Sequence, residues 1–88
     1  MKVSVVTILS NNDGNTELTK KVFSTFESAS KYLQKEYDEI KNDLENDEYT
    51  TITNEYVERD GEYIKEFFLE DDPIYWISGE IEVMEVEQ

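Results

Sequence analysis

The segment STFESASKYLQKEYDEIKNDLE, residues 24–45, decides the fold of this chain. Its apolar residues recur at spacings of three and four, the period of one face of an α-helix; they are Phe26, Ala29, Leu33, Tyr37, Ile40 and Leu44. Ser24 followed three residues later by Glu27 is the pattern of a capping box, so we expect the helix to begin there. We expect it to end near Leu44 or Glu45, where a polar segment follows.

Segments rich in β-branched and aromatic residues on either side of the helix predict strands. We expect five strands, at residues 2–10, 17–23, 49–59, 62–69 and 74–86. The first is apolar on both faces, which is typical of an interior strand. We therefore predict a single α+β domain over residues 1–88, in which one helix packs on one face of an antiparallel sheet and the elements follow the order β-β-α-β-β-β.

Turns and alternation refine this prediction. Residues 11–16 predict a turn around Gly14, and Asp60-Gly61 is typical of a type I′ hairpin turn, in which both central residues have positive φ. Residues 70–73 predict a break before the last strand. In the fourth strand, we expect Glu66 to share a face with Ile64 and Phe68.

Alternation in the last strand predicts which side chains share a face. We expect Tyr75, Ile77, Ile81 and Val83 on one face and Trp76, Ser78, Glu80 and Glu82 on the other. Gly79 predicts a bulge or a close backbone approach. The alternation fails at Val83-Met84, so we expect the strand to bend or fray there.

Net charge is the strongest feature of the composition. The chain has 22 acidic and 8 basic residues, a formal net charge of -14. The imbalance is uneven: residues 1–35 carry a net +2 and residues 36–88 a net -16. Such a field repels nucleic acids and acidic membrane surfaces and attracts basic surfaces. We therefore expect a basic protein partner and no direct contact with nucleic acid or membrane.

The residue types that most often carry catalysis are absent. The chain has no histidine and no cysteine, which excludes Ser-His-Asp and Cys-His sites, thiolate metal sites and disulfides. Acids at residues 70–72 and oxygen-bearing side chains at residues 11–17 leave a hard-cation site as an alternative, but Leu9 stands where an EF-hand loop requires an acid. We expect no enzymatic activity, no cofactor and no metal; a catalytic carboxylate pair is the minor enzymatic alternative.

The expected location is cytoplasmic. The apolar run in the N-terminal segment MKVSVVTILS is shorter than a secretory signal requires. No stretch of the chain approaches the roughly 20 apolar residues of a membrane-spanning helix. The absence of cysteine fits a reducing compartment.

Regularly spaced acids are the candidate binding residues. On the helix they recur at i, i+3, i+7 and i+11, which predicts one exposed stripe, and on the last strand two share a face. We include Trp76 among the candidates as an aromatic anchor of the interface, because aromatic residues dominate binding hot spots. The alternative for Trp76 is a structural role, half-buried at a sheet edge. The candidates for partner binding are Glu36, Glu39, Asp43, Asp47, Glu62, Glu66, Glu70, Asp71, Asp72, Glu80, Glu82 and Trp76.

The size, the acidity, the lack of cysteine and the abundance of Lys, Asn, Glu, Ile and Tyr resemble those of small acidic proteins of phages and mobile elements. The segment VFSTFESA, residues 22–29, is similar to the strand-to-helix junctions of small phage-encoded proteins. The resemblance is to anti-restriction and anti-CRISPR inhibitors of the DNA-mimic type.

Together, the acidity and this resemblance imply a non-enzymatic inhibitor. Its acidic surface would occupy the nucleic-acid site of a basic protein, such as a nuclease or a restriction or CRISPR component, because closely spaced carboxylates present fixed negative charge as phosphates do. The alternative is a structural or assembly module that forms a homodimer by pairing of sheet edges, with the acidity serving solubility.

Overall fold

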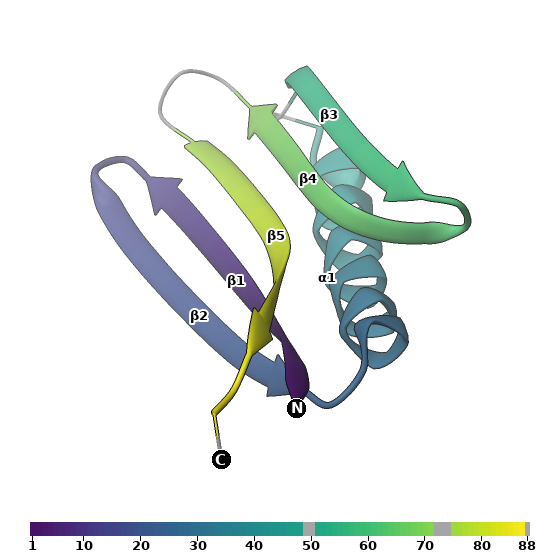
Figure 1. Ribbon diagram of the computed structural model, residues 1–88. Coiled ribbons are helices and arrows are strands. Elements are labelled where there is room, and N and C mark those ends of the chain that lie inside the picture. The colour runs from purple at the N-terminus through teal and green to yellow at the C-terminus, as the bar shows by residue number, and fades with distance from the viewer. Residues whose placement is uncertain (49–50, 72–74, 88) are drawn as a thin grey trace.

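The computed structural model contains one helix, α1 (Phe26–Asn46), packed against one face of a five-stranded antiparallel sheet (Figure 1). The strands are β1 (Lys2–Asn12), β2 (Asn15–Phe23), β3 (Ile52–Asp60), β4 (Tyr63–Asp71) and β5 (Tyr75–Glu85). They lie side by side in the order β2-β1-β5-β4-β3, so β5 is central and β2 and β3 are the two edges. The predicted α+β class, the order of elements and the interior position of β1 are confirmed.

The structure describes residues 1–48, 51–71 and 75–87. The first two residues of the predicted third strand, half of the predicted break at residues 70–73 and the first residue of the predicted last strand lie outside them. Within the described part, β4 continues through Glu70 and Asp71, where the sequence predicted that the strand had already ended.

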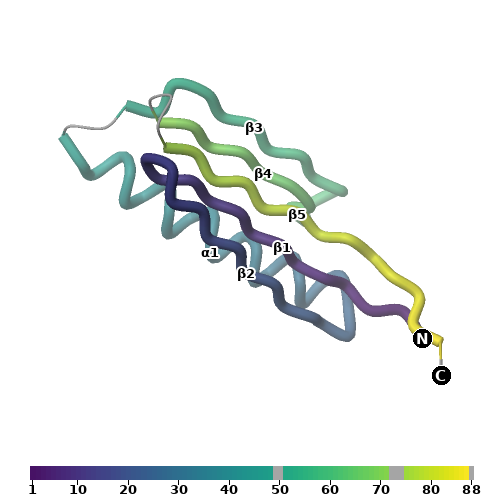
Figure 2. The backbone as a smooth tube through the Cα atoms, turned by 90° about the vertical axis from the view of Figure 1, so that its left-hand side faces the viewer, coloured from purple at the N-terminus to yellow at the C-terminus, as the bar shows by residue number. Residues whose placement is uncertain are grey.

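The core lies between α1 and the sheet, whose strands lie side by side in Figure 2. The predicted helical stripe supplies Ala29, Leu33 and Tyr37, all buried. They pack on strand residues that include Phe67 and Ile64, both 0% exposed. Burial of side chains of this size stabilises the fold by roughly 1.5–3 kcal/mol each.

Gly79 allows the helix to approach the sheet closely. A Cβ atom at this position would lie 2.5 Å from Cε1 of Phe67 and 2.7 Å from Cδ1 of Leu33, closer than carbon atoms pack. The cross-strand register with β1 runs unbroken through Gly79, which faces Ile8. The sequence predicted either a bulge or a close backbone approach at Gly79, and the structure confirms the close approach.

The start of the helix corrects the capping prediction by one residue. The N-cap is Thr25, and its Oγ1 accepts a hydrogen bond from the backbone N–H of Ser28 at 3.1 Å. Ser24 is therefore not the cap, and Glu27 does not close a capping box; it pairs with Lys31 one turn later, at 3.3 Å. Thr25 has the extended backbone that an N-cap needs, and its hydroxyl serves as well as that of serine.

The two hairpins end in tight turns. Asp13 and Gly14 have φ values of 50° and 88°, and Asn12 pairs with Asn15, so β1 and β2 extend further into residues 11–16 than predicted. Positive φ at both central residues is the geometry of a type I′ turn. The second turn differs from the predicted one, because Asp60 is still paired with Tyr63 and the central residues are Gly61 and Glu62. Of Asp60, Gly61 and Glu62, only Gly61 has positive φ, at 62°, so the turn is not of the predicted type I′.

An irregularity in β4 overturns one predicted face. Glu66 pairs with Glu58 of β3, but Ile64 pairs with Arg59, so Lys65 is an extra residue between them. Such a bulge shifts the alternation by one position. Ile64 therefore points into the core, where Ser30 Oγ donates a hydrogen bond of 2.7 Å to its carbonyl, whereas Glu66 and Phe68 lie on the opposite face.

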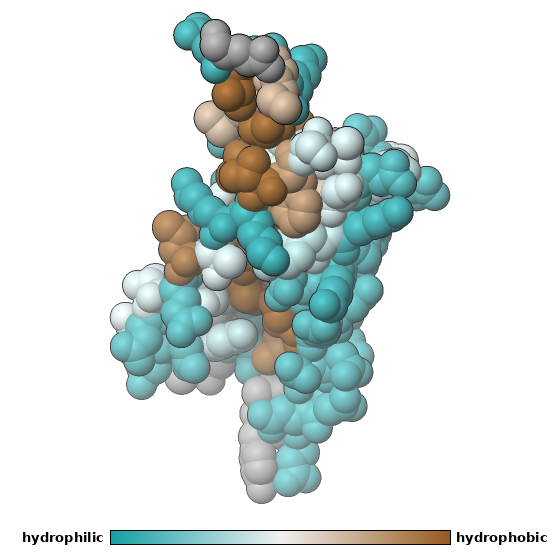
Figure 3. Space-filling view, turned by 90° about the horizontal axis from the view of Figure 1, so that it is seen from below, coloured by the Kyte–Doolittle hydropathy of each residue, from teal (hydrophilic) through white to brown (hydrophobic). Residues whose placement is uncertain are grey.

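The last strand does not fray at Val83-Met84. Pairing with β1 continues through Met84 and Glu85, which face Val3 and Lys2. The alternation fails because β1 and β5 extend past the end of α1 (Figure 2), so that both faces of the ribbon are exposed there. Met1, Val83 and Met84 are 64%, 54% and 45% exposed, and Figure 3, which looks at the end that carries the termini, shows apolar atoms at the surface. None of the described helices is long and apolar enough to cross a membrane.

Candidate functional site

The face of the sheet that α1 does not cover, here called the open face, gathers acidic residues from three strands. Glu66 on β4 is directly opposite Glu80 on β5 and Glu58 on β3. These three residues form the acidic row. Adjacent strands lie about 4.8 Å apart, so the row places three carboxylates on neighbouring strands without a base between them.

The acidic row carries electrostatic strain. Burial of its carboxyl group raises the pKa of Glu66 above the ordinary value of 4.5, and the neighbouring carboxyl groups of Glu58 and Glu80 raise it further. Glu58 is the better compensated member: hydrogen bonds from Tyr56 (3.0 Å) and Lys65 (3.2 Å) lower its pKa. Like charges directly opposite one another destabilise a sheet. The centre of the row is therefore short of positive charge.

A row of apolar side chains crosses the open face beside the acidic row. In register order from β2 to β3 it contains Leu18, Leu9, Phe68 and Tyr56, with Ser78 of β5 between Leu9 and Phe68. The ring of Trp76 stacks on Phe68 at a centroid distance of 6.3 Å. Trp76 is half-buried, as the alternative for this residue had it, but it lies on the central strand rather than at a sheet edge.

A small hollow lies where the two rows meet. It has a volume of about 140 Å³ and is lined by Thr7, Leu9, Glu66, Ser78, Gly79 and Glu80. Both carboxylates that line it, those of Glu66 and Glu80, belong to the acidic row. The open face thus combines the half-buried rings of Phe68 and Trp76, a recess, and an acidic row whose central residue has a raised pKa.

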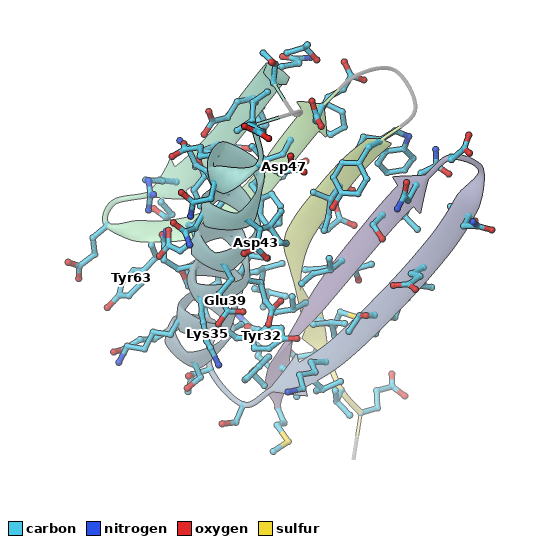
Figure 4. All side chains as sticks on the ribbon, turned by 180° about the vertical axis from the view of Figure 1, so that it is seen from behind. Tyr32, Lys35, Glu39, Asp43, Asp47 and Tyr63 are labelled. Carbon is cyan, nitrogen blue, oxygen red and sulfur yellow. The ribbon has the colours of Figure 1, made fainter. Side chains whose placement is uncertain are left out.

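The predicted acidic stripe of the helix forms a second, separate surface. Glu39, Asp43 and Asp47 are exposed, and Glu36 is half-buried beside Tyr32. Asp47 is the C-cap residue rather than part of the helix. Figure 4 shows Tyr32 and Asp43 on the side of α1 that faces β1 and β2, with Tyr63 on the other side. Glu36, Glu39 and Asp43 make no ion pair with any described residue.

The opposite flank of α1, toward β3, is tied down by polar contacts. Lys41 Nζ lies 2.8 Å from Glu55 Oε1, and the hydroxyl of Tyr37 donates to the same carboxylate. Hydrogen bonds from Lys41 and Tyr37 lower the pKa of Glu55. Near the start of the helix, Arg59 Nη1 donates to Gln34 Oε1 at 2.9 Å. These contacts attach the helix to β3. More of the charged side chains on this flank are therefore paired than on the flank that carries Glu36, Glu39 and Asp43.

Of the remaining predicted residues, Asp71 and Glu62 join neither surface, whereas Glu70 and Glu82 lie on the open face outside the acidic row. Asp71 is buried, and its carboxylate accepts the backbone N–H of Thr51 at 2.8 Å, which is a structural role. Glu62 lies in the turn between β3 and β4, where its carbonyl is 3.5 Å from Arg59 Nη1. Glu70 faces Trp76 on the open face, and Glu82 is next to Glu80 along it. Asp72 lies outside the described residues.

Sequence reasoning missed Glu58 as a member of the open face; it correctly placed Phe68 on the face of Glu66 but did not include it among the candidates for partner binding. Alternation of Asn54, Tyr56 and Glu58 along β3 was the signal that could have found Glu58. Within the described residues, no three acidic side chains converge in a way that could hold a metal ion. Comparisons with protein-family models, with curated proteins and with solved structures find no match to this chain.

Proposed function

We propose that this protein is a non-enzymatic inhibitor whose open face binds a basic, nucleic-acid-binding protein at the site where that protein holds phosphates. The acidic row carries the proposal. A sheet in which Glu66 faces Glu58 and Glu80 is less stable than one with a base in the row, so the arrangement has a cost that a partner's positive charge would offset. Trp76 and Phe68 add the apolar area that anchors an interface.

The mechanism is competition. A protein with net charge -14 is drawn to a basic cleft from a distance, and its carboxylates then exclude the nucleic acid sterically and electrostatically. The resemblance to DNA-mimic inhibitors makes a restriction or CRISPR nuclease the first partner class to test. Such partners act on nucleic acid in the cytoplasm, which is the location that we propose for this protein.

Affinity capture from host lysate tests this function. The tagged protein is immobilised, and bound proteins are released by steps of increasing salt, with and without added DNA or RNA. We expect a basic nucleic-acid-binding protein that elutes with salt and is displaced by nucleic acid, because charge dominates both contacts. Bound proteins that resist salt and ignore nucleic acid would reject the proposal.

A further inference from the structure

The two edges of the sheet differ in regularity and charge. β3 has register shifts between Ile52 and Asn54 and between Glu58 and Arg59, and it carries three acids against one base. β2 is nine residues long without proline, is exposed from Asn15 to Val22, and carries two lysines against one glutamate. A long, regular, unpaired edge is a template for another strand. Because the rest of the chain is strongly acidic, a second copy approaching β2 meets the least repulsion.

The turn between β1 and β2 determines which backbone groups of β2 face outward. In a type I′ turn the flanking residues, Asn12 and Asn15, form a hydrogen-bonded pair. Hydrogen-bonded and non-hydrogen-bonded pairs then alternate along the hairpin. Alternate residues from Asn15 onward therefore turn their N–H and C=O groups toward β1, and Thr16, Leu18, Lys20 and Val22 turn theirs to the open edge.

Pairing of β2 with β2 of a second copy about a two-fold axis must join these outward-facing residues. With the axis at Thr19, Leu18 of one copy pairs with Lys20 of the other. Glu17 then lies opposite Lys21 of the second copy in a non-hydrogen-bonded pair, where side chains approach most closely. The two-fold axis makes this ion pair twice. Shifting the register by two places Lys20 opposite Lys20 or Leu18 opposite Leu18, and neither arrangement brings Glu17 to Lys21.

We infer that the protein forms a homodimer by antiparallel pairing of β2 with β2 of a second copy, in the register that places Thr19 opposite Thr19 and Glu17 opposite Lys21. The sheet then has ten strands, with both helices on the same face. Leu18 and Val22, which are 60% and 66% exposed in one copy, come to lie at the junction. The dimer does not depend on the proposed inhibitory function, because the acidic row lies near the other edge of the sheet.

Two charge reversals with opposite effects test the register. The Glu17→Lys chain has lysine at both positions, and the Lys21→Glu chain has glutamate at both. Each chain paired with itself has two repulsive contacts, but one chain of each kind restores two attractive contacts. Masses are measured by sedimentation equilibrium over a range of concentrations. Both positions are exposed, and far-UV circular dichroism checks that both variants fold.

We expect the wild-type chain to sediment at twice its 10.4 kDa and each variant alone to dissociate with a dissociation constant raised about tenfold or more. An equimolar mixture of the two variants should form a dimer again. Glu87→Lys, which makes the same charge change outside the sheet, should dimerise like wild type. A monomeric wild-type chain, variants that dimerise as wild type does, or a mixture that stays monomeric would each overturn the inference.

Discussion

The two faces of the sheet are built from alternate residues of the same strands, yet they differ in how their charges are compensated. On the covered face, Glu55 receives hydrogen bonds from Lys41 and Tyr37, and its pKa is lowered. On the open face, Glu66 has carboxylates on both sides, and its pKa is raised. Both are glutamates on neighbouring strands, so the difference lies in what packs against them. The covered face supplies hydrogen bonds to its carboxylate, whereas the open face surrounds Glu66 with other carboxylates.

The largest expected contrast is between two adjacent phenylalanines. Phe67 is fully buried under α1, whereas Phe68 is half-buried on the open face against Trp76. Phe67→Ala should lower the free energy of unfolding by about 3–5 kcal/mol, since it leaves a cavity in the core. Phe68→Ala should cost clearly less, because the ring is only half-buried and its removal leaves no closed cavity; the loss is the aromatic pair with Trp76, about 0.5–1.5 kcal/mol, plus the burial of part of the ring. Urea unfolding followed by circular dichroism measures both; equal losses would mean that the faces are equally packed.

A smaller loss is expected from Glu55→Gln on the covered face. At neutral pH it should destabilise the fold by about 1–2 kcal/mol, because it removes the charge from the hydrogen bonds with Lys41 and Tyr37. The lowered pKa of Glu55 gives stability that is present above its ordinary value of 4.5 and is lost as the pH falls through the folded-state value. The difference from wild type should therefore shrink in acid.

The matched control is Glu45→Gln, since Glu45 is an exposed residue 3.9 Å from the same lysine nitrogen. It should change the free energy of unfolding by less than about 0.5 kcal/mol. Thermal melts from pH 3 to pH 7 measure both variants. A loss for Glu55→Gln that does not depend on pH would contradict the role assigned to its charge.

The smallest effect, and the one of opposite sign, is expected from Glu66→Gln in the acidic row. Because the pKa of Glu66 is raised in the fold, the wild-type protein loses stability as the pH rises from 4.5 through that higher value. The variant should therefore be more stable than wild type at neutral pH, by roughly 0.2–1 kcal/mol, and equally stable in acid. Glu82→Gln, on the same face but opposite Val5, should gain less. A destabilised Glu66→Gln protein would show that the row is not repulsive.

The sequence predicted the fold well where the pattern was local. The helical stripe depends on residues within a few helical turns, and it was correctly placed. The Asp60-Gly61 turn was misplaced by one residue, because Asp60 pairs with Tyr63 and the central residues are Gly61 and Glu62. The bulge at Lys65 was missed because it depends on how β4 pairs with β3, which reversed the face assigned to Ile64. The sequence likewise treated all acids as one set. Only strand order brings Glu58, Glu66 and Glu80 together and separates them from the helical stripe on the other side of the sheet.

The most direct test of the open face as the binding surface compares two double variants with the same charge change. Glu66→Lys/Glu80→Lys reverses the acidic row, and Glu39→Lys/Asp43→Lys reverses the exposed helical stripe. Each is titrated against the captured partner by isothermal calorimetry, after circular dichroism confirms the fold. We predict that the first variant loses about 100-fold or more in affinity, because like charges then meet across the interface, and that the second loses far less. Equal losses, or a larger loss from the helical variant, would contradict the account.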